Sequence, residues 1–183
     1  LQGYRVCSVD LSGKSLDELT SRAKEFDVCD NLQTVKADFN AFAASFSERF
    51  DVVSFIKVLH HFPSRSYISE ALHKGYKLLK NGGRLVGFEP NGDCPLWLPW
   101  LMTKGREHFL EERNVALIRR DFLKRVFQSL DFAEYEFGYR YVVPGCLATR
   151  SACLGKLDRV VCRYLPAQVL ALNLGFTVRK RLP

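Results

Sequence analysis

The first ninety residues alternate between short apolar runs and stretches with helical spacing. Four runs predict strands, at residues 4–9, 34–37, 52–58 and 84–89. The run 52–58 is nearly continuous and β-branched, which is typical of a central strand covered on both faces by helices. Strands that alternate with helices at this spacing predict a parallel sheet joined by right-handed crossovers.

The stretches between these runs carry helix signals. The pattern Ser15-x-x-Glu18 is a capping box, and it predicts a helix start. The apolar residues expected on one face of this helix are Leu16, Leu19, Ala23 and Phe26. Ser64 or Ser66 is expected to cap the next helix, and residues 81–83, Asn-Gly-Gly, are expected to end it.

The second half changes character. Residues 91–113 show little periodicity, which favours a lid or a short broken helix, whereas residues 115–130 predict an amphipathic helix. Alternation from about 134 to 143 and from 169 to 180 predicts two strands that pair antiparallel at the end of the sheet. The expected fold class is α/β: a Rossmann-like, doubly wound, mostly parallel sheet with helices on both faces and an antiparallel C-terminal strand pair.

Composition narrows the possible classes of protein further. The chain has 183 residues, 47% of them hydrophobic, which excludes disorder. No apolar run reaches the roughly 18 residues of a membrane span, so we expect a soluble or at most surface-bound protein. Six cysteines occur without a CxxC pair or a nearby histidine, so we expect reduced thiols, a cytoplasmic location and no metal site.

The net charge of +7 is concentrated in the second half of the chain. Residues 1–90 hold 12 Lys and Arg against 11 Asp and Glu, whereas residues 91–183 hold 15 against 9. The longest basic block is residues 179–181, and there is no RNA-binding aromatic signature. We therefore expect no nucleic-acid partner.

The ends of the expected strands carry the candidate chemistry, because ligands bind at the carboxyl ends of parallel strands. These ends deliver Asp10, Asp38, residues 57–61 and residues 89–91. A carboxylate there accepts hydrogen bonds from ribose hydroxyls, and a second acid accepts them from an amino group such as that of adenine. Each Asp alone also has an ordinary explanation at a strand end or helix start. Together they indicate a nucleoside site.

Five short motifs follow one another in the first half. They are Val9-Asp10-Leu11-Ser12, Lys36-Ala37-Asp38-Phe39, Phe50-Asp51-Val52-Val53, Val58-Leu59-His60-His61-Phe62, and Leu78-Leu79-Lys80-Asn81-Gly82-Gly83-Arg84-Leu85 with Phe88-Glu89-Pro90. This ordered set resembles the class I S-adenosylmethionine-dependent methyltransferases of the small-molecule type. The resemblance covers about residues 4–90 and continues more faintly to the closing strand pair.

The resemblance implies S-adenosylmethionine as the cofactor and direct displacement at its sulfonium methyl. The protein would contribute mainly alignment and, for an oxygen or nitrogen nucleophile, one base. The implied cofactor contacts are Asp10 on the ribose hydroxyls, Leu11 and Phe39 beside adenine, Asp38 on its amino group, and Lys57 and Val58 at the methionine end.

Two histidines are candidate catalytic bases. His61 follows the expected central strand, and His108 lies in the expected lid. The lid segment 94–102 places Trp97 and Trp100 near cations, which permits peripheral membrane contact. A lid that packs on the body is the favoured alternative, and in either case an apolar or lipid-like acceptor is expected.

The chain departs from the family at its beginning, because it contains no GxGxxG. Counting back about 20 residues from Asp10 places that loop before Leu1. We therefore expect that an upstream segment is missing, that the sheet is split between the strands ending at Asp10 and Val58, and that this chain alone is poorly stable and inactive.

The expected organisation is one methyltransferase-like domain over residues 1–183, incomplete at its N-terminus. Residues 1–90 are expected to bind the cofactor, and residues 91–113 to form a lid or substrate segment. Residues 114–183 are expected to supply the C-terminal helix and strand pair.

The leading functional hypothesis is methyl transfer to a small-molecule acceptor. A nicotinamide-dependent oxidoreductase is one alternative, since a strand-end acid such as Asp10 also suits the NAD ribose. A non-catalytic methyltransferase-like interaction module is the other. The sequence does not identify the acceptor or the oligomeric state.

Overall fold

The computed structural model describes residues 3–47, 49–102, 106–130, 132–140, 142, 151–163 and 165–182. The chain forms two compact units, Leu1–Ser47 and Glu48–Pro183. No helix in these described ranges is long and apolar enough to cross a membrane.

The first unit is a parallel strand pair with its connecting helix. Its elements are β1 (Val6–Asp10), α1 (Gly13–Glu25), the 3-10 turn η1 (Cys29–Asn31), β2 (Leu32–Lys36) and α2 (Phe39–Ala43). Asp10 lies opposite Lys36 in the register of the pair. The two strands predicted in this region of the sequence are therefore confirmed.

Helix α1 begins earlier than the capping box predicted. Ser12 is its N-cap, and the Ser12 side chain accepts a hydrogen bond from the Ser15 amide at 3.2 Å. The reason is local, because Asp10 Oδ1 accepts from the Ser12 amide at 2.7 Å and tightens the turn after β1. Phe26, expected on the buried face, is 71% exposed because the helix ends at Glu25.

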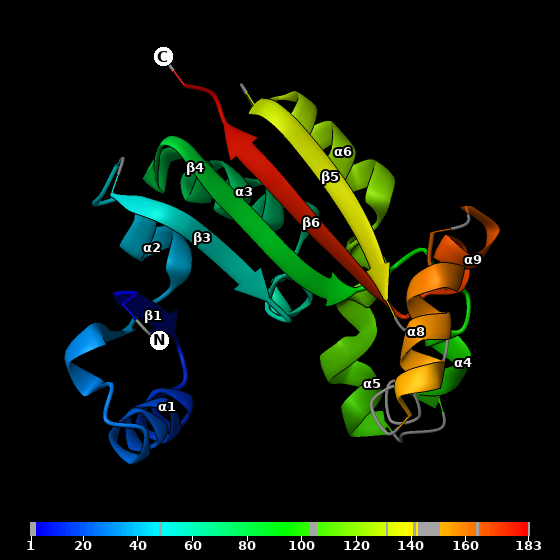
Figure 1. The fold of residues 1–183 in the computed structure, drawn as a ribbon, viewed down its shortest axis with the longest axis horizontal. Coiled ribbons are helices and arrows are strands. Elements are labelled where there is room, and N and C mark those ends of the chain that lie inside the picture. Colours follow the sequence, from blue (N-terminus) through cyan, green and yellow to red (C-terminus); the bar gives the residue numbers. More distant parts are fainter. Residues whose placement is uncertain are drawn as a thin grey trace. The chain divides into compact units, whose positions relative to one another are not determined.

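The second unit is built on a four-stranded sheet in the order β3-β4-β6-β5 (Figure 1). The strands are β3 (Phe50–Ile56), β4 (Leu79–Pro90), β5 (Phe132–Arg140) and β6 (Asn173–Lys180). β3 and β4 are parallel, whereas β6 runs antiparallel to both of its neighbours, β4 and β5. The predicted antiparallel C-terminal pair is confirmed.

The helices of this unit include two long ones that lie on one face of the sheet, α3 (Arg65–Leu78) and α6 (Arg120–Gln128) (Figure 1). Ser64 is the N-cap of α3, which confirms one of the two predicted alternatives. The remaining helical segments are η2 (Leu59–His61), α4 (Trp97–Met102), α5 (Arg106–Glu112), η3 (Arg113–Leu117), α8 (Ala152–Val161) and α9 (Leu165–Leu170).

Several boundaries differ from the predictions. Residues 81–83 lie inside β4 instead of ending a helix, because Gly82 adopts a φ of 75° where the pairing with β3 shifts register. The predicted strand from residue 169 begins only at Asn173, since α9 occupies the preceding residues. Helices α8 and α9 were not predicted.

The core of the second unit lies between the sheet and helices α3 and α6. Phe127 of α6 is 1% exposed, and its ring lies 5.1–5.9 Å from four aromatic rings of β5 and β6. These neighbours are Phe132, Tyr135, Phe137 and Phe176. The period-two aromatic pattern of β5 and β6 therefore serves this core.

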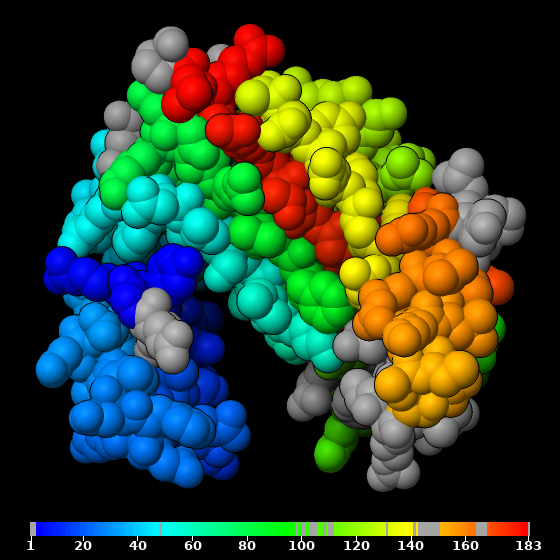
Figure 2. Space-filling model, in the orientation of Figure 1, coloured from blue at the N-terminus to red at the C-terminus, as the bar shows by residue number. Residues whose placement is uncertain are grey.

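Strand β3 is not covered on both faces within this unit. Val53 and Phe55 are buried, but Val52 is 54% and Ile56 65% exposed. Figure 2 shows that face, where side chains of the four strands lie at the surface. Among the described residues β3 pairs with β4 alone, and β1 and β2 form a separate sheet, so the expected split between these strands is present.

Candidate active site

Two acids lie at one edge of the first unit. β1 and β2 are parallel, and the Ala37 amide donates to the Asp10 carbonyl at 3.2 Å, so Asp10 and Asp38 follow neighbouring strand ends. Asp10 Oδ1 accepts from the Ser12 amide at 2.7 Å, and Asp38 Oδ1 accepts from the Ala41 amide at 3.0 Å. Local backbone amides therefore orient both carboxylates. Each of these local contacts uses one of the about four acceptor positions of its carboxylate.

The residues that follow these acids differ in burial. Leu11, which directly follows Asp10, is 68% exposed. Phe39 is half-buried at the first position of α2. This edge thus combines acceptors with an accessible apolar surface.

In the second unit, a buried carboxylate joins the ends of β3 and β4. Glu89 is fully buried, and its Oε1 accepts from the Val58 amide at 2.9 Å and the Leu59 amide at 3.0 Å. Its Oε2 lies 2.7 Å from His60 Nδ1. These contacts satisfy the buried acid and fix the turn after β3.

His60 lies between two acids. The residue is 2% exposed, and the second nitrogen of its ring, Nε2, lies 3.3 Å from Glu112 Oε2 of α5. His61 is exposed, and its ring centroid lies 4.1 Å from that of His60. The sequence pattern offered both histidines as possible bases and favoured His61, because only the distant Glu89 and Glu112 distinguish the two.

Lys57 and Val58 occupy the turn that Glu89 holds. Lys57 has a φ of 51°, a left-handed conformation that is uncommon for residues other than glycine. Its amide donates to the Phe88 carbonyl at 2.8 Å. Both residues therefore lie at the carboxyl end of β3, as the sequence predicted, and their contact with a cofactor stays a prediction.

Comparison with known proteins agrees with this geometry. Residues 1–87 match the methyltransferase domain family. A possible exported protein from Bordetella parapertussis has a TM-score of 0.64 at 17% identity, and the match covers 97% of this chain but only 53% of that one. A SAM-dependent methyltransferase from Archaeoglobus fulgidus has a TM-score of 0.61 at 15% identity, with 97% and 87% covered. No curated protein matches.

The chain has the class I methyltransferase fold. A third solved structure, the [4+2]-cyclase SpnF, has a TM-score of 0.62 at 15% identity, with 98% of this chain and 67% of that one covered. The family match implies S-adenosylmethionine as the cofactor. The fold itself serves more than one reaction, as the cyclase shows.

In this methyltransferase fold, polar contacts that the sequence did not reveal hold the segment after β4 against residues 168–172. Asn91 is fully buried, and its Nδ2 donates to the carbonyls of Gln168 at 3.2 Å and Ala171 at 2.8 Å. The Trp97 Nε1 donates to the Leu172 carbonyl at 3.0 Å. Trp97 is thereby fixed to the body of its unit, and its contact with a membrane surface stays a prediction.

Two other residues of the expected lid cannot be placed in the same way. The side chains of Trp100 and His108 lie outside the described residues, although the His108 backbone is in α5. The predicted roles of both side chains therefore stay predictions.

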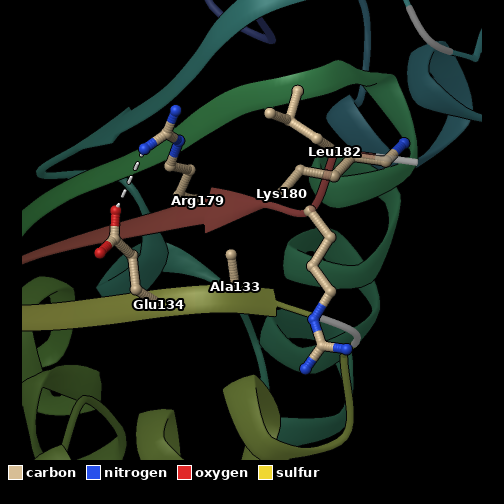
Figure 3. Close-up of a pocket in the computed structure, with 6 residues that line it drawn as sticks. Ala133, Glu134, Arg179, Lys180 and Leu182 are labelled. Carbon is tan, nitrogen blue, oxygen red and sulfur yellow. Dashed lines mark ion pairs between the residues drawn. The ribbon is translucent and has the colours of Figure 1, made fainter.

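A basic pocket lies elsewhere in the methyltransferase fold, between the start of β5 and the end of β6 (Figure 3). It is lined by Ala133, Glu134, Arg179, Lys180, Arg181 and Leu182. Arg179 pairs with Glu134 at 3.5 Å, and Lys180 Nζ donates to the Leu79 carbonyl at 2.8 Å. Because β6 is antiparallel to β4, Arg179 pairs with Arg84 and Leu174 pairs with Glu89. This pocket therefore lies at the opposite end of the strands from Glu89. Its cations serve the protein's own contacts, so it is not part of the candidate active site.

Cys94, near Trp97 in this fold, is not an activated nucleophile. The residue is 4% exposed, and burial raises the pKa of its thiol. A raised pKa keeps the thiol protonated and unreactive near neutral pH.

Proposed function

We propose that this protein transfers a methyl group from S-adenosylmethionine to a small-molecule acceptor. The observation that carries the proposal is the placement of Asp10 and Asp38 at one edge of a parallel strand pair, with an exposed Leu11 beside them. Two acceptors and an apolar surface match the ribose hydroxyls, amino group and ring of an adenine nucleoside.

The donor set of the first unit fits the nucleoside half of S-adenosylmethionine. Asp10 would accept from the ribose hydroxyls, Asp38 would accept from the adenine amino group, and Leu11 and Phe39 would pack beside the ring. That Lys57 and Val58 contact the methionine end stays a prediction from the sequence. When bound, the cofactor supplies a methyl group already activated by its sulfonium.

The chain's own contribution is alignment. Glu89 accepts from the amides of Val58 and Leu59, so the turn after β3 is fixed before any ligand arrives. Alignment of this kind removes about 7–11 kcal/mol of a bimolecular barrier. His61 and His108 are the two candidates to take a proton from an oxygen or nitrogen acceptor.

The segment around α4 supports an apolar or lipid-like acceptor. Leu96 is 51% and Met102 72% exposed in a stretch of the chain otherwise tied to the body by Trp97. Exposed apolar side chains on a held segment offer a surface to an apolar ligand.

Calorimetric titration of the protein at its natural full length tests the nucleoside site. Asp10→Asn keeps one oxygen for the Ser12 amide but removes the charge and the second acceptor oxygen. We expect it to weaken binding of S-adenosylmethionine by about tenfold or more, since a charge-assisted hydrogen bond contributes about 1.5–3 kcal/mol. Asp17→Asn, an exposed change on α1, is the matched control and should leave the affinity unchanged.

The same titration separates the alternatives. Unchanged affinity in Asp10→Asn would remove Asp10 from the site. Binding of NAD in place of S-adenosylmethionine would favour the oxidoreductase, and binding of neither ligand would favour the interaction module.

A further inference from the structure

The contacts of Glu89 determine which nitrogen of His60 carries a proton. Glu89 Oε1 accepts from the amides of Val58 and Leu59, and an ionised Glu89 can only accept at Oε2, which lies 2.7 Å from His60 Nδ1. Nδ1 is therefore the protonated nitrogen. In a neutral imidazole the other nitrogen, Nε2, then carries a lone pair.

That lone pair faces a second carboxylate. His60 Nε2 lies 3.3 Å from Glu112 Oε2, and two acceptors at this distance repel each other unless a positive charge lies between them. A shared proton or a bound cation between the two atoms removes this repulsion. The separation matches a cation, because two ligands about 2.0–2.1 Å from a tetrahedral metal lie about 3.3 Å apart.

A third group favours the cation. His61 adds another imidazole, and one ligand atom each from His60, His61 and Glu112 lie within 4.8 Å of one another. A proton shared by His60 and Glu112 needs no second imidazole, whereas two imidazoles and one carboxylate are an established ligand set for zinc and other divalent transition metals.

We propose that His60, His61 and Glu112 bind a divalent transition-metal ion, with zinc as the ion that this ligand set fits, and that Glu89 positions His60 from behind. A carboxylate on the far nitrogen of a ligating histidine fixes the tautomer and ring orientation. Because His61 is exposed and the Glu112 side chain is 20% exposed, an ion can reach the cluster from solvent. Three protein ligands leave one position for water or a substrate oxygen.

This site is independent of the proposed methyl transfer, but it bears on the choice of base. A metal-bound His61 nitrogen is not free to accept a proton, so an occupied site assigns the base role to His108. The sequence predicted no metal site, because only cysteines and short histidine spacings carry a local signal. Glu112 lies on a helix far along the chain, so no local motif marks it.

Zinc titration of untagged, chelator-treated protein in competition with a chromophoric chelator tests the proposal. The wild type should bind one equivalent, and His61→Ala and Glu112→Gln should each weaken binding at least tenfold. His73→Ala on α3 and Glu107→Gln on α5 are the matched controls and should bind zinc as the wild type does. Circular dichroism checks that each variant is folded. If His61→Ala does not fold, the zinc affinity of Glu112→Gln, a change at a partly exposed residue, decides the test.

Cobalt substitution provides a second measurement. Co²⁺ in the proposed site should give visible absorption bands that disappear in Glu112→Gln and persist in Glu107→Gln. Absence of zinc binding in the wild type, unchanged binding in both ligand variants, or a sulfur-to-cobalt charge-transfer band would overturn the proposal. In those cases a proton, not a metal ion, lies between His60 and Glu112.

Discussion

The acids at the strand ends of the two units differ in how far along the chain their hydrogen-bond partners lie. In the first unit, Asp10 and Asp38 accept from amides two and three residues away. In the second, Glu89 is fully buried and accepts from groups 29 to 31 residues away. Loss of a carboxylate that accepts from nearby amides should therefore disturb the fold less than loss of one that joins distant segments.

Removal of Glu89 should show this difference most strongly. Glu89→Ala leaves two amides and a histidine without their buried acceptor, and we expect a loss of about 3–5 kcal/mol in the free energy of unfolding. Urea unfolding measures it. Glu134→Ala, which removes an exposed glutamate paired with Arg179, is the control and should cost less than about 1 kcal/mol. Equal losses in the two variants would contradict the comparison.

Removal of Asp38 should cost less. Asp38 is the N-cap of α2, so Asp38→Ala should lower the free energy of unfolding by about 1 kcal/mol. Asp38→Ser restores a capping oxygen and should recover that stability. If Asp38 also binds adenine, the serine variant still loses affinity for the cofactor, and calorimetry separates the two roles.

A smaller effect on stability is expected at Lys57 and Asp27, the two described residues other than glycine with a left-handed backbone conformation. Lys57 has a φ of 51° and Asp27 a φ of 52°. Lys57→Gly and Asp27→Gly should each raise the free energy of unfolding by up to about 1 kcal/mol, because glycine adopts this conformation without strain. Lys57→Ala is the control, since alanine keeps the strain. A gain in the alanine variant equal to that in glycine would mean that the lysine side chain, not the backbone, is unfavourable.

The smallest effect concerns the buried thiol. Burial raises the pKa of Cys94 in the folded state, so its contribution to stability is full below the ordinary thiol pKa and is lost as pH rises through the folded value. From neutral pH to about pH 10, the wild type should lose slightly more stability than Cys94→Ala. Cys153, which is exposed, should be alkylated by iodoacetamide well before Cys94, and mass spectrometry can follow both. Alkylation at equal rates would show that Cys94 is not protected.

The features that the sequence predicted correctly are those with local causes. The positions of Asp10 and Asp38 at the ends of or just after β1 and β2, the cap at Ser64 and the alternation in β5 each depend on residues close together in the chain. The features that the sequence predicted incorrectly share one cause. The burial of one face of β3, the extension of β4 across Gly82 and the late start of β6 all depend on which segment packs against them.

The candidate site divides in the same way. Asp10 and Asp38 could be identified because a parallel sheet brings its strand ends together. His60 could not be distinguished from its neighbour His61, because its role comes from Glu89 on another strand and Glu112 on α5. Two adjacent histidines look equivalent in a pattern, yet one is buried between acids and the other is exposed.

The position of β6 also affects how the second unit is made in the cell. β6 pairs with both β4 and β5, although it follows both in the chain. While a ribosome is still adding the residues before 173, β4 lacks one neighbour and β5 lacks the strand it pairs with. Open edges of this kind invite pairing with other chains. The sheet therefore cannot be completed until translation has passed residue 180, so we expect nascent chains of this protein to depend on chaperones that shield strand edges.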